Sequence, residues 1–452
     1  MEGNADEVRT VDLIIIGGGP GGYEIAAAEA AKGRKVVLVE KDKLGGTCLN
    51  RGCIPTKALC ASASVLLKAC AAGDYGISLS NPVVDYPRVA ARKDAVVVSL
   101  RADIEASLAG VELVTAEARL EAGPKVRIVG GAAYKAEKII IATGSRPKRL
   151  PVPGAELAMD SSDIIALEVL PADIVIIGAG VIGMEFASVL SAFGVEVTVL
   201  EYCKEVLPAF DAEVAKRLRS MLSRRGVKFV LGAAVKEIKP DFSVDYETKK
   251  GLQTIGASAV LMAVGREPVL PEGLKEAGVT LNERGFIEVD DTMQTDAFGV
   301  YAVGDVNGIC MLAHAASAQA RVAVGEDVDM DIMPSVVFSE PECAMVGLTE
   351  EMCKAQGADF LTVKVPYASN GKALASGEAE GFVKLVFSPV THLLLGCHAV
   401  GAHSADLVAE AAAAMYGMIP VDELADELIH AHPTLSELLA SAARKAAAMC
   451  RE

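Results

Sequence analysis

The sequence has no tryptophan, and aromatic residues make up only 4% of its 452 residues. Proteins that bind single-stranded nucleic acid stack bases on exposed aromatic rings, so this composition argues against that class. Positive charge is also scarce, because the formal net charge is −17. A chain this acidic repels phosphate backbones and anionic lipid headgroups, so nucleic acid and membrane surfaces are poor partners.

Long apolar runs and abundant cysteine are missing as well. No uninterrupted apolar run reaches the roughly 18 residues that a membrane-spanning helix needs. The longest candidate, Ile174–Met184, contains glycines and stops at Glu185. Residues 1–10 are polar and acidic, unlike a signal or transit peptide. Ten cysteines are too few for a secreted disulfide scaffold. We therefore expect a cytoplasmic protein, with an organellar protein that has lost its presequence as the alternative.

Hydrophobic residues, in contrast, are abundant and occur in characteristic runs. They make up 52% of the chain, and many lie in short Val/Ile/Leu segments. Such segments predict strands that are buried on both faces, as parallel sheets require. The chain is too long for a single core, so we expect about three domains.

One unit occurs twice along the chain. In each copy an apolar strand runs into a glycine-rich turn, followed by a helix and a second strand that ends on a glutamate. Equivalent residues of the two copies are 161 positions apart. The key residues are Gly17, Gly19, Gly22 and Glu40 in the first copy, and Gly178, Gly180, Gly183 and Glu201 in the second. One copy alone is weak evidence, but two copies indicate two dinucleotide-binding units.

Each residue type in this unit has a physical role. The first glycine permits the tight turn, the second lets a pyrophosphate approach the backbone, and the third lets helix and strand pack closely. The helix then directs unpaired N–H groups at the pyrophosphate. The glutamate accepts hydrogen bonds from ribose hydroxyls, and Glu201 would repel the 2′-phosphate of NADP, so we expect NAD. The alternatives are a plain glycine-rich turn for each copy and a solvated surface charge for Glu201.

Three further predicted strands end in glycine, at residues 139–144, 260–265 and 300–305. A glycine at the carboxyl end of a strand lets a ligand lie against bare backbone. Asp305, at the end of the third segment, is suited to bind a sugar-like hydroxyl. Each of the three glycines is equally compatible with a plain strand end.

Residues 45–57 contain two cysteines, Cys48 and Cys53. On a regular helix a spacing of five residues gives roughly 7.5 Å of rise, whereas a disulfide tolerates only about 4.4–6.8 Å between Cα atoms. If the two cysteines pair, the backbone must be distorted, which Gly52 and Pro55 permit. The alternatives are a coincidental spacing or a zinc site, although no Cys/His cluster accompanies the pair. We expect no metal.

This segment resembles the redox-active disulfide of the pyridine nucleotide–disulfide oxidoreductases, and its sequence is most similar to that of the dihydrolipoamide dehydrogenase branch. The resemblance covers essentially the whole chain. It implies FAD at the first unit, NAD at the second, and a homodimer. Further residues that it implies for FAD are Gly46, Thr47, Lys57, Thr143, Gly144, Asp305, Met311, Leu312, Ala313 and His314, and for NAD Gly265.

A second chemical motif, His430 to Glu437, lies near the carboxyl terminus, although the chain has only six histidines. Thiol chemistry needs a base, and a histidine oriented by a carboxylate can remove and return the proton. The resemblance implies that His432 is the acid/base and Glu437 its orienting partner, acting on the other subunit's disulfide. For His430 we keep a structural role.

The resemblance also implies the reaction, which is oxidation of protein-bound dihydrolipoamide with reduction of NAD+. Cys48 would be the interchange thiol and Cys53 the thiol nearer the flavin, with Lys57 and Glu185 as an ion pair beside it. The implied partners are a lipoyl-bearing acyltransferase core or a glycine-cleavage carrier protein. The alternatives are a related reductase for glutathione, CoA or another disulfide, and a docking subunit of a 2-oxoacid dehydrogenase complex.

The predicted fold class is α/β, with two doubly wound Rossmann-like domains and a carboxyl-terminal α+β dimerisation domain. We expect an FAD-binding domain at 1–145, an NAD-binding domain at 146–264, a central segment completing the FAD domain at 265–329, and the dimerisation domain at 330–452. Two residues depart from the family pattern. Arg51 replaces a small apolar residue, and Glu267 lies in a run that usually reads basic-Pro-Asn.

Overall fold

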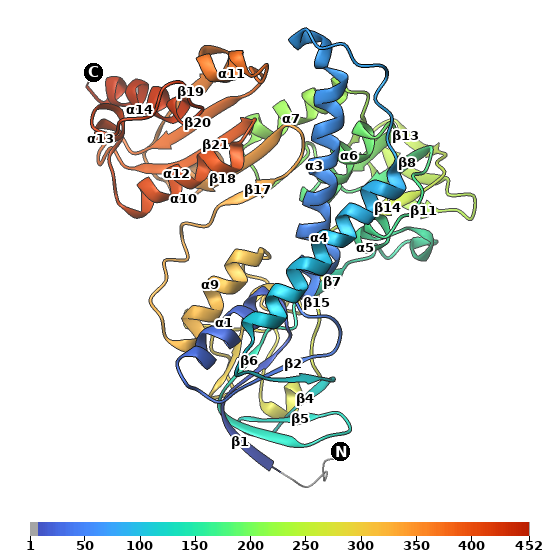
Figure 1. The fold of residues 1–452 in the computed structure, drawn as a ribbon, viewed down its shortest axis with the longest axis vertical. Helices are drawn as coiled ribbons and strands as arrows, with labels where there is room; N and C mark the ends of the chain where they lie inside the picture. The colour runs from blue at the N-terminus through green and yellow to red at the C-terminus, as the bar shows by residue number, and fades with distance from the viewer. Residues whose placement is uncertain (1–7, 452) are drawn as a thin grey trace.

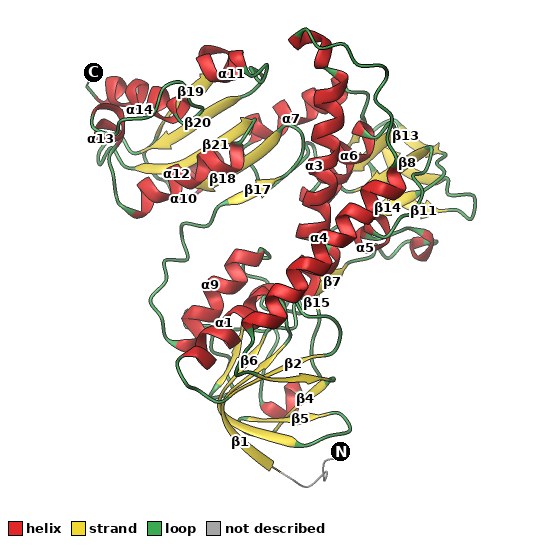
Figure 2. Ribbon diagram, in the orientation of Figure 1, coloured by secondary structure: helices red, strands yellow, loops and turns green. Residues whose placement is uncertain are grey.

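The computed structural model describes residues 8–451. Residues 1–7 and residue 452 lie outside the described part. The prediction that residues 1–10 are not a signal or transit peptide falls mostly on these residues. Three lobes surround two long helices, α3 (Cys53–Cys70) and α4 (Tyr86–Ser107), and each lobe contains one larger sheet (Figures 1 and 2). The predicted fold class is confirmed, because two sheets have a parallel centre and the third is antiparallel.

The first sheet combines strands that precede the second dinucleotide-binding unit in the chain with one strand, β16, that follows it. β1 (Val8–Ile16) pairs in parallel with β2 and β6, in the order β3-β2-β1-β6-β5-β4, and β16 pairs in parallel with β6. The parallel pairing of β1 with β2 requires a crossover, which α1 supplies. The other elements are α1 (Pro20–Ala31), β2 (Val36–Glu40), α2 (Gly46–Arg51), η1 (Ala72–Tyr75), β3 (Glu112–Thr115), β4 (Ala118–Glu121), β5 (Lys125–Ile128), β6 (Ala133–Ile141), α8 (Leu274–Ala277), β16 (Val300–Ala302), η3 (Gly304–Val306) and α9 (Ala313–Val324).

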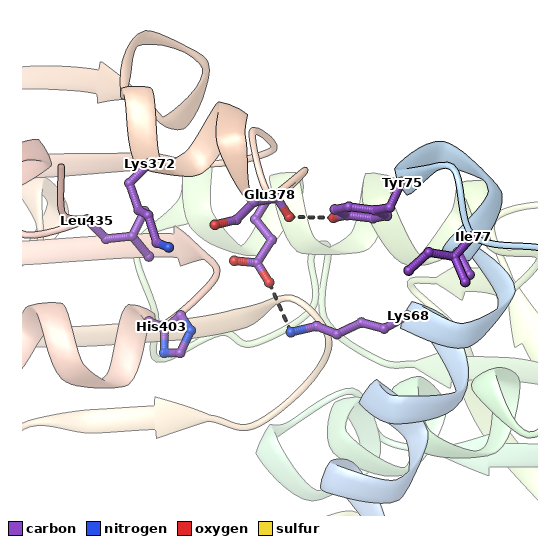
Figure 3. A pocket seen from close by; sticks show the side chains of 9 residues that line it. Lys68, Tyr75, Ile77, Lys372, Glu378, His403 and Leu435 are labelled. Carbon is purple, nitrogen blue, oxygen red and sulfur yellow. Dashed lines mark hydrogen bonds and ion pairs between the residues drawn. The ribbon is translucent and has the colours of Figure 1, made fainter.

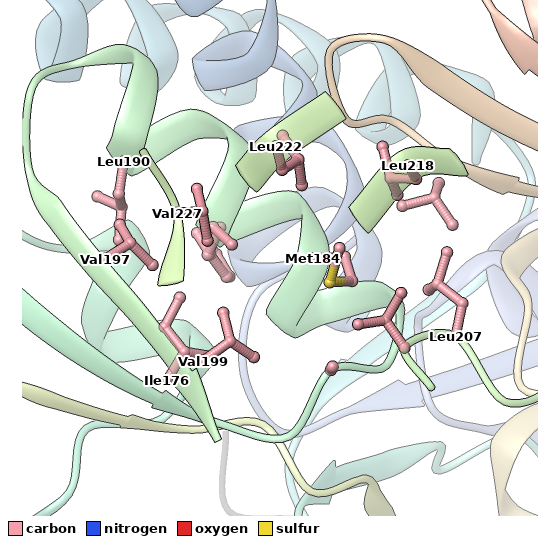
Figure 4. Packing of buried hydrophobic residues seen from close by; sticks show 14 of the residues in the cluster. Ile176, Met184, Leu190, Val197, Val199, Leu207, Leu218, Leu222 and Val227 are labelled. Carbon is pink, nitrogen blue, oxygen red and sulfur yellow. The ribbon is translucent and has the colours of Figure 1, made fainter. Parts of the chain in front are cut away.

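The second sheet has the strand order β10-β9-β8-β14 and is parallel throughout. Helix α6 (Val181–Ala192) is buried on all sides from Gly183 to Leu190, as its apolar sequence predicts. Figure 4 shows Met184 of this helix among buried side chains of the sheet and of α7. The elements are η2 (Ala155–Leu157), α5 (Ser161–Ile165), β8 (Asp173–Ile177), β9 (Glu196–Glu201), α7 (Ala212–Arg224), β10 (Lys228–Leu231), β11 (Ala234–Ile238), β12 (Val244–Thr248), β13 (Gly251–Ile255) and β14 (Val260–Met262).

The third sheet is antiparallel, in the order β17-β18-β21-β20-β19. Its buried Lys384 binds Asp211 of the second lobe, with 2.9 Å between Nζ and Oδ2, and Glu350 Oε1 at 2.5 Å. This cluster joins the second and third lobes. The elements are β17 (Ser335–Val337), β18 (Glu342–Gly347), α10 (Glu350–Gln356), β19 (Leu361–Pro366), η4 (Tyr367–Ser369), α11 (Gly371–Ala375), β20 (Phe382–Phe387), β21 (Leu394–Gly401), α12 (Ser404–Tyr416), α13 (Val421–Asp426) and α14 (Glu437–Cys450).

A two-stranded ribbon marks where the chain leaves and re-enters the first lobe. β7 (Ser145–Pro147) precedes the second lobe, β15 (Arg266–Pro268) follows it, and the two strands pair antiparallel. They lie beside the boundaries that we propose after residues 145 and 264.

One helical stretch, Gly46–Cys70, is long and apolar enough by composition to cross a bilayer. This stretch contains no long uninterrupted apolar run, because Lys57 and several Ser and Thr residues lie within it. The stretch consists of two helices separated at Gly52, and α3 packs against α4 and α6 along part of its length. Core helices of this composition are common, so the stretch is weak evidence for a membrane segment.

Candidate active site

The two cysteines lie on either side of a break between helices. Cys48 belongs to α2, and Cys53 is the first residue of α3. Gly52 between them has φ −146° and ψ −110°, which ends the regular helix. A Cβ at Gly52 would lie 2.9 Å from the carbonyl oxygen of Thr47. The distortion that pairing of the cysteines requires is therefore present at Gly52.

The two thiols contact each other and differ in acidity. They are not joined by a disulfide in the structure, and they hydrogen-bond to each other. The hydrogen bond from Cys48, aided by the Lys57 ammonium, lowers the pKa of Cys53 to about 7 against the opposing effect of burial. The same hydrogen bond and burial raise the pKa of Cys48. Since the thiolate is the reactive form of cysteine, Cys53 carries the charge of the reduced pair.

An ion pair lies one helical turn beyond Cys53. Lys57 Nζ is 3.0 and 3.1 Å from the two carboxylate oxygens of Glu185 on α6. The backbone N–H of Phe338 donates to Glu185 at 2.9 Å, and the Lys57 ammonium lies 4.5 Å from the centroid of the Phe338 ring. The Glu185 side chain is only 5% exposed, and a charge so deeply buried requires partners of this kind.

The predicted histidine–carboxylate pair forms near the start of α14. His432 Nδ1 lies 2.9 Å from Glu437 Oε1, and Thr434 N–H donates to Glu437 Oε2 at 2.9 Å. The hydrogen bond with His432 lowers the pKa of Glu437. His432 is 79% exposed, and its Nε2 has no hydrogen-bond partner among residues 8–451. His430 instead binds Glu410 on α12 at 2.6 Å and is nearly buried, which agrees with a structural role.

The first glycine-rich turn is crowded at two glycines and open at the third. A Cβ at Gly17 would lie 2.3 Å from the Ala142 carbonyl oxygen, and a Cβ at Gly22 1.9 Å from that of Gly17. At Gly19 the nearest atom would be 3.9 Å away. Gly19 also precedes α1 without a side-chain cap, which leaves first-turn N–H groups for an anion. The turn therefore fits the pyrophosphate of FAD.

The second turn repeats this geometry closely. A Cβ at Gly178 would lie 2.4 Å from the Ala263 carbonyl oxygen, and a Cβ at Gly183 2.0 Å from that of Gly178. A Cβ at Gly180 would meet nothing within 4 Å, and α6 also lacks a side-chain cap. The residues fit a second dinucleotide.

The two glutamates are held in the same way. Glu40 accepts hydrogen bonds from the N–H groups of Gly18 at 2.7 Å and Asp42 at 2.8 Å. Glu201 accepts them at 2.6 Å from Ala179 and Cys203, which occupy the equivalent positions. Each carboxylate is thus fixed beside its turn, with lone pairs remaining for a hydroxyl donor.

The other residues predicted for FAD lie at the starts of helices and the ends of strands. Thr47 is in α2, and a Cβ at Gly46 would lie 2.7 Å from the Gly19 Cα, so this segment abuts the first turn. Leu312 precedes α9, which begins at Ala313 and has no side-chain cap, and Met311 is 39% exposed.

Three predicted polar groups have protein partners instead of being free. Thr143 donates its hydroxyl to the Val269 carbonyl at 2.6 Å, and His314 Nε2 contacts the Pro334 carbonyl at 2.8 Å. Asp305 accepts the hydroxyl of Ser145 and lies 3.6 Å from Arg266. Gly144 and Gly265 have φ of +69° and +107° with no neighbour near an added Cβ.

The sequence did not single out Arg266 and Tyr23. The Arg266 guanidinium is largely buried and interacts electrostatically with Cys53, and burial lowers its pKa. Tyr23 lies near Cys48, and burial raises its pKa. Arg266 follows Gly265 and Tyr23 follows Gly22, so adjacency to a motif was the only available signal.

The two departures from the family pattern each form a surface ion pair. Arg51 binds Asp42, and Glu267 lies 2.7 Å from Arg146 across the β7–β15 ribbon. Neither Arg51 nor Glu267 is left as an isolated charge. Among residues 8–451, no group of three or more His, Cys, Asp or Glu side chains is arranged to hold a metal ion.

Two hollows are present near these residues. A cavity of about 370 Å³ contains Cys48 and is walled by α1, α2, α3 and α4. A second, of about 420 Å³, lies between the end of α3 and the third lobe, and Lys68 and Glu378 form an ion pair across it (Figure 3). None of the predicted site residues lines the second hollow. His432 lines neither hollow.

Comparisons with known proteins cover nearly the whole chain. A family model described as pyridine nucleotide-disulphide oxidoreductase matches residues 11–320, and the dimerisation domain of the same family matches residues 333–443. The dihydrolipoyl dehydrogenases of Geobacillus stearothermophilus and Thermus scotoductus are 38% and 41% identical, over 96% of this chain and 96% and 97% of theirs. Two solved structures at 29% identity cover 96% of this chain and 99% of their own. They are LpdA from Mycobacterium tuberculosis, with a TM-score of 0.87, and the HOCl-induced flavoprotein disulfide reductase RclA from Escherichia coli, with 0.85.

Proposed function

We propose that this chain, which belongs to the pyridine nucleotide–disulphide oxidoreductase family, is an FAD-containing dihydrolipoyl dehydrogenase that reduces NAD+. Family membership makes it a flavoprotein disulfide oxidoreductase, and the substrate and the nicotinamide are the proposed part. The observation that carries the proposal is the contact between Cys48 and Cys53, whose pKa values are shifted in opposite directions beside Lys57.

The two cysteines perform the exchange with the substrate. In the oxidised enzyme they form a disulfide, and one thiolate of the substrate dithiol attacks the Cys48 sulfur. A substrate–Cys48 disulfide forms, and Cys53 leaves as a thiolate. The second substrate thiol then displaces Cys48, which closes the substrate's own disulfide. Two electrons have moved to the cysteine pair, and two protons have left the substrate, one of which protonates the displaced Cys48 sulfur, whose pKa is raised.

The other proton goes to a histidine. The free Nε2 of His432 can accept it, because Glu437 binds Nδ1 and fixes the ring. Within one chain the histidine lies in the third lobe, away from the cavity at Cys48. We therefore assign the role to His432 of the partner subunit, and the match to the family's dimerisation domain supports a homodimer.

The glycine-rich turns would hold the two dinucleotides, FAD at Gly19 and Glu40, and NAD+ at Gly180 and Glu201. FAD, when bound, would supply a two-electron acceptor between the cysteine pair and NAD+, and Cys53 is the thiol that we assign to the flavin side. Glu201 puts a carboxylate where the 2′-phosphate of NADP would lie, so NAD+ is the proposed acceptor. The lipoyl group would be carried by an acyltransferase core or a glycine-cleavage carrier protein.

Anaerobic titration of the FAD-loaded protein with dihydrolipoamide tests the proposal. We expect a long-wavelength band from a thiolate against the flavin, and steady-state reduction of NAD+ that exceeds that of NADP+. Cys48→Ser should abolish dihydrolipoamide turnover yet keep FAD and the reduction of artificial dyes by NADH. Cys60→Ser, on the following helix α3, is the matched control and should keep all activities. No band and no turnover in the wild-type protein would refute the function.

A second candidate is reduction of another disulfide with electrons from NADH. The similarity to the RclA structure favours it, because that protein is described as a flavoprotein disulfide reductase and its TM-score nearly equals that of LpdA. Measurement of NADH oxidation with glutathione disulfide, CoA disulfide and lipoamide distinguishes the two candidates.

A further inference from the structure

One face of α4 lines the cavity at Cys48. Its residues Leu100, Asp103, Ile104 and Ser107 face the cavity, with the three- and four-residue spacing of one helix side. The remaining wall comes from the starts of α1, α2 and α3, through Pro20, Tyr23, Gly45, Cys48, Leu49 and Ile54. A substrate that reaches the Cys48 sulfur through this cavity must therefore pass α4.

The wall is mostly apolar, and its only charged side chain is the carboxylate of Asp103. No lysine, arginine or histidine is among the described residues that line it. Two nearby arginines do not line it; Arg101 donates to the Asn50 side-chain oxygen, and Arg51 pairs with Asp42. Glu24, which accepts a hydrogen bond from Tyr23 at 3.2 Å, adds negative charge at the same entrance.

We propose that Asp103 is a specificity-determining residue, which admits dithiols on an uncharged aliphatic chain and disfavours thiols that carry a carboxylate or phosphate. This inference rests on the proposed function and narrows its substrate class. A carboxylate in the cavity would lose water, meet a like charge, and find no cation to pair with. The aliphatic stem of a lipoyl amide, in contrast, matches the apolar side chains of Leu49, Leu100 and Ile104.

Two substrates with the same dithiol test this filter. Dihydrolipoamide ends in a neutral amide and dihydrolipoate in a carboxylate, so the ratio of their kcat/KM values reports the charge preference. We expect Asp103→Asn to raise kcat/KM for dihydrolipoate by about fivefold, as expected for like charges several ångströms apart in a partly hydrated site. The value for dihydrolipoamide should stay within about twofold, and high salt should narrow the wild-type preference.

Glu105→Gln is the matched control, because Glu105 is an exposed carboxylate on the same helix that does not line the cavity. It removes the same charge from the protein and should leave the ratio unchanged. The proposal is overturned if the ratio of the two kcat/KM values is equal in wild type, Asp103→Asn and Glu105→Gln. It is also overturned if both variants shift that ratio equally, because the effect would then be one of net charge.

A second measurement does not depend on turnover. The reduced protein is treated with neutral iodoacetamide or anionic iodoacetate, and the label on Cys48 is quantified by peptide mass spectrometry. Asp103→Asn should raise the iodoacetate rate relative to iodoacetamide by about fivefold, and an unchanged ratio would refute the filter. Absence of dihydrolipoamide turnover would refute the proposed function alone, because the alkylation ratio still tests the role of Asp103.

Discussion

Replacing Gly180 with alanine should weaken NAD+ binding without disturbing the fold, whereas the same change at Gly183 should disturb both. Gly180 has φ −72°, a value that any residue adopts, and an added Cβ meets no protein atom within 4 Å. The open space is where we expect the pyrophosphate. At Gly183 an added Cβ would lie 2.0 Å from the Gly178 carbonyl oxygen, so backbone must move.

The magnitudes separate the two variants. Relief of the contact at Gly183 needs a shift of about 1 Å. Overpacking of this kind lowers the free energy of unfolding by about 3 kcal/mol. The higher helix propensity of alanine offsets about 1 kcal/mol of that loss. Gly183→Ala should thus lose about 2 kcal/mol of stability. Gly180→Ala should lose about 0.5 kcal/mol, because Gly180 only precedes the helix, but its methyl group should raise the Kd for NAD+ by at least about tenfold.

The assay combines calorimetric titration with NAD+, denaturant unfolding and the flavin absorbance of the purified protein. Both variants should keep full FAD content, because the flavin turn is a separate unit. Gly19→Ala, the equivalent change in the first turn, should reverse the pattern and lower FAD content. If Gly180→Ala bound NAD+ as tightly as wild type, the open space at Gly180 would not belong to the ligand.

Three further predictions concern charges. Lys57→Met should raise the pKa of Cys53 above its value of about 7, as followed by thiolate absorbance, because the ammonium favours the charged form. That pKa lies below the roughly 8.5 of an unfolded thiol. The reduced wild-type protein should therefore gain stability over Cys53→Ser as the pH rises from about 7 to about 8.5, and lose this gain as the pH falls. Lys384→Met should cost about 3–5 kcal/mol in denaturant unfolding because the buried carboxylate of Asp211 loses its partner. Lys364→Met, at an exposed pair, should cost under about 1 kcal/mol. Glu437→Gln should lower dihydrolipoamide turnover by about 100-fold with NADH–dye activity retained, and an unchanged rate would exclude Glu437 as the orienting group.

Local features of the site were predictable from sequence because each depends on residues close in the chain. The crowding at Gly22 and Gly183 follows from the turn itself, and the break at Gly52 is the distortion expected if the two cysteines pair. The comparisons confirm the family and the fold class that these motifs indicated. The pairing of Lys57 with Glu185 came from the resemblance alone, since the two residues are 128 positions apart.

Features that depend on distant contacts were not predictable. Asp305 was expected to offer its carboxylate to a hydroxyl, but Ser145 and Arg266, both far along the chain, already bind it. Asp103 carried no signal, because nothing in a helix sequence shows which side will face a cavity built by other helices. The apolar character of Gly46–Cys70 was not predicted either. It lies in the mean hydropathy of a long window that includes polar residues, and not in an uninterrupted apolar run.

The carboxylate of Glu185 joins the second lobe to two other parts of the chain. It belongs to the second lobe, and it binds the ammonium of the helix that starts at Cys53 and a backbone N–H at the start of the third lobe. Rotation of the second lobe as a rigid body would break these bonds and leave an unpaired ion in a poorly hydrated place, at a cost of several kcal/mol. The three lobes are therefore held together at a point beside the sulfur pair, and this point resists rigid-body rotation of the second lobe.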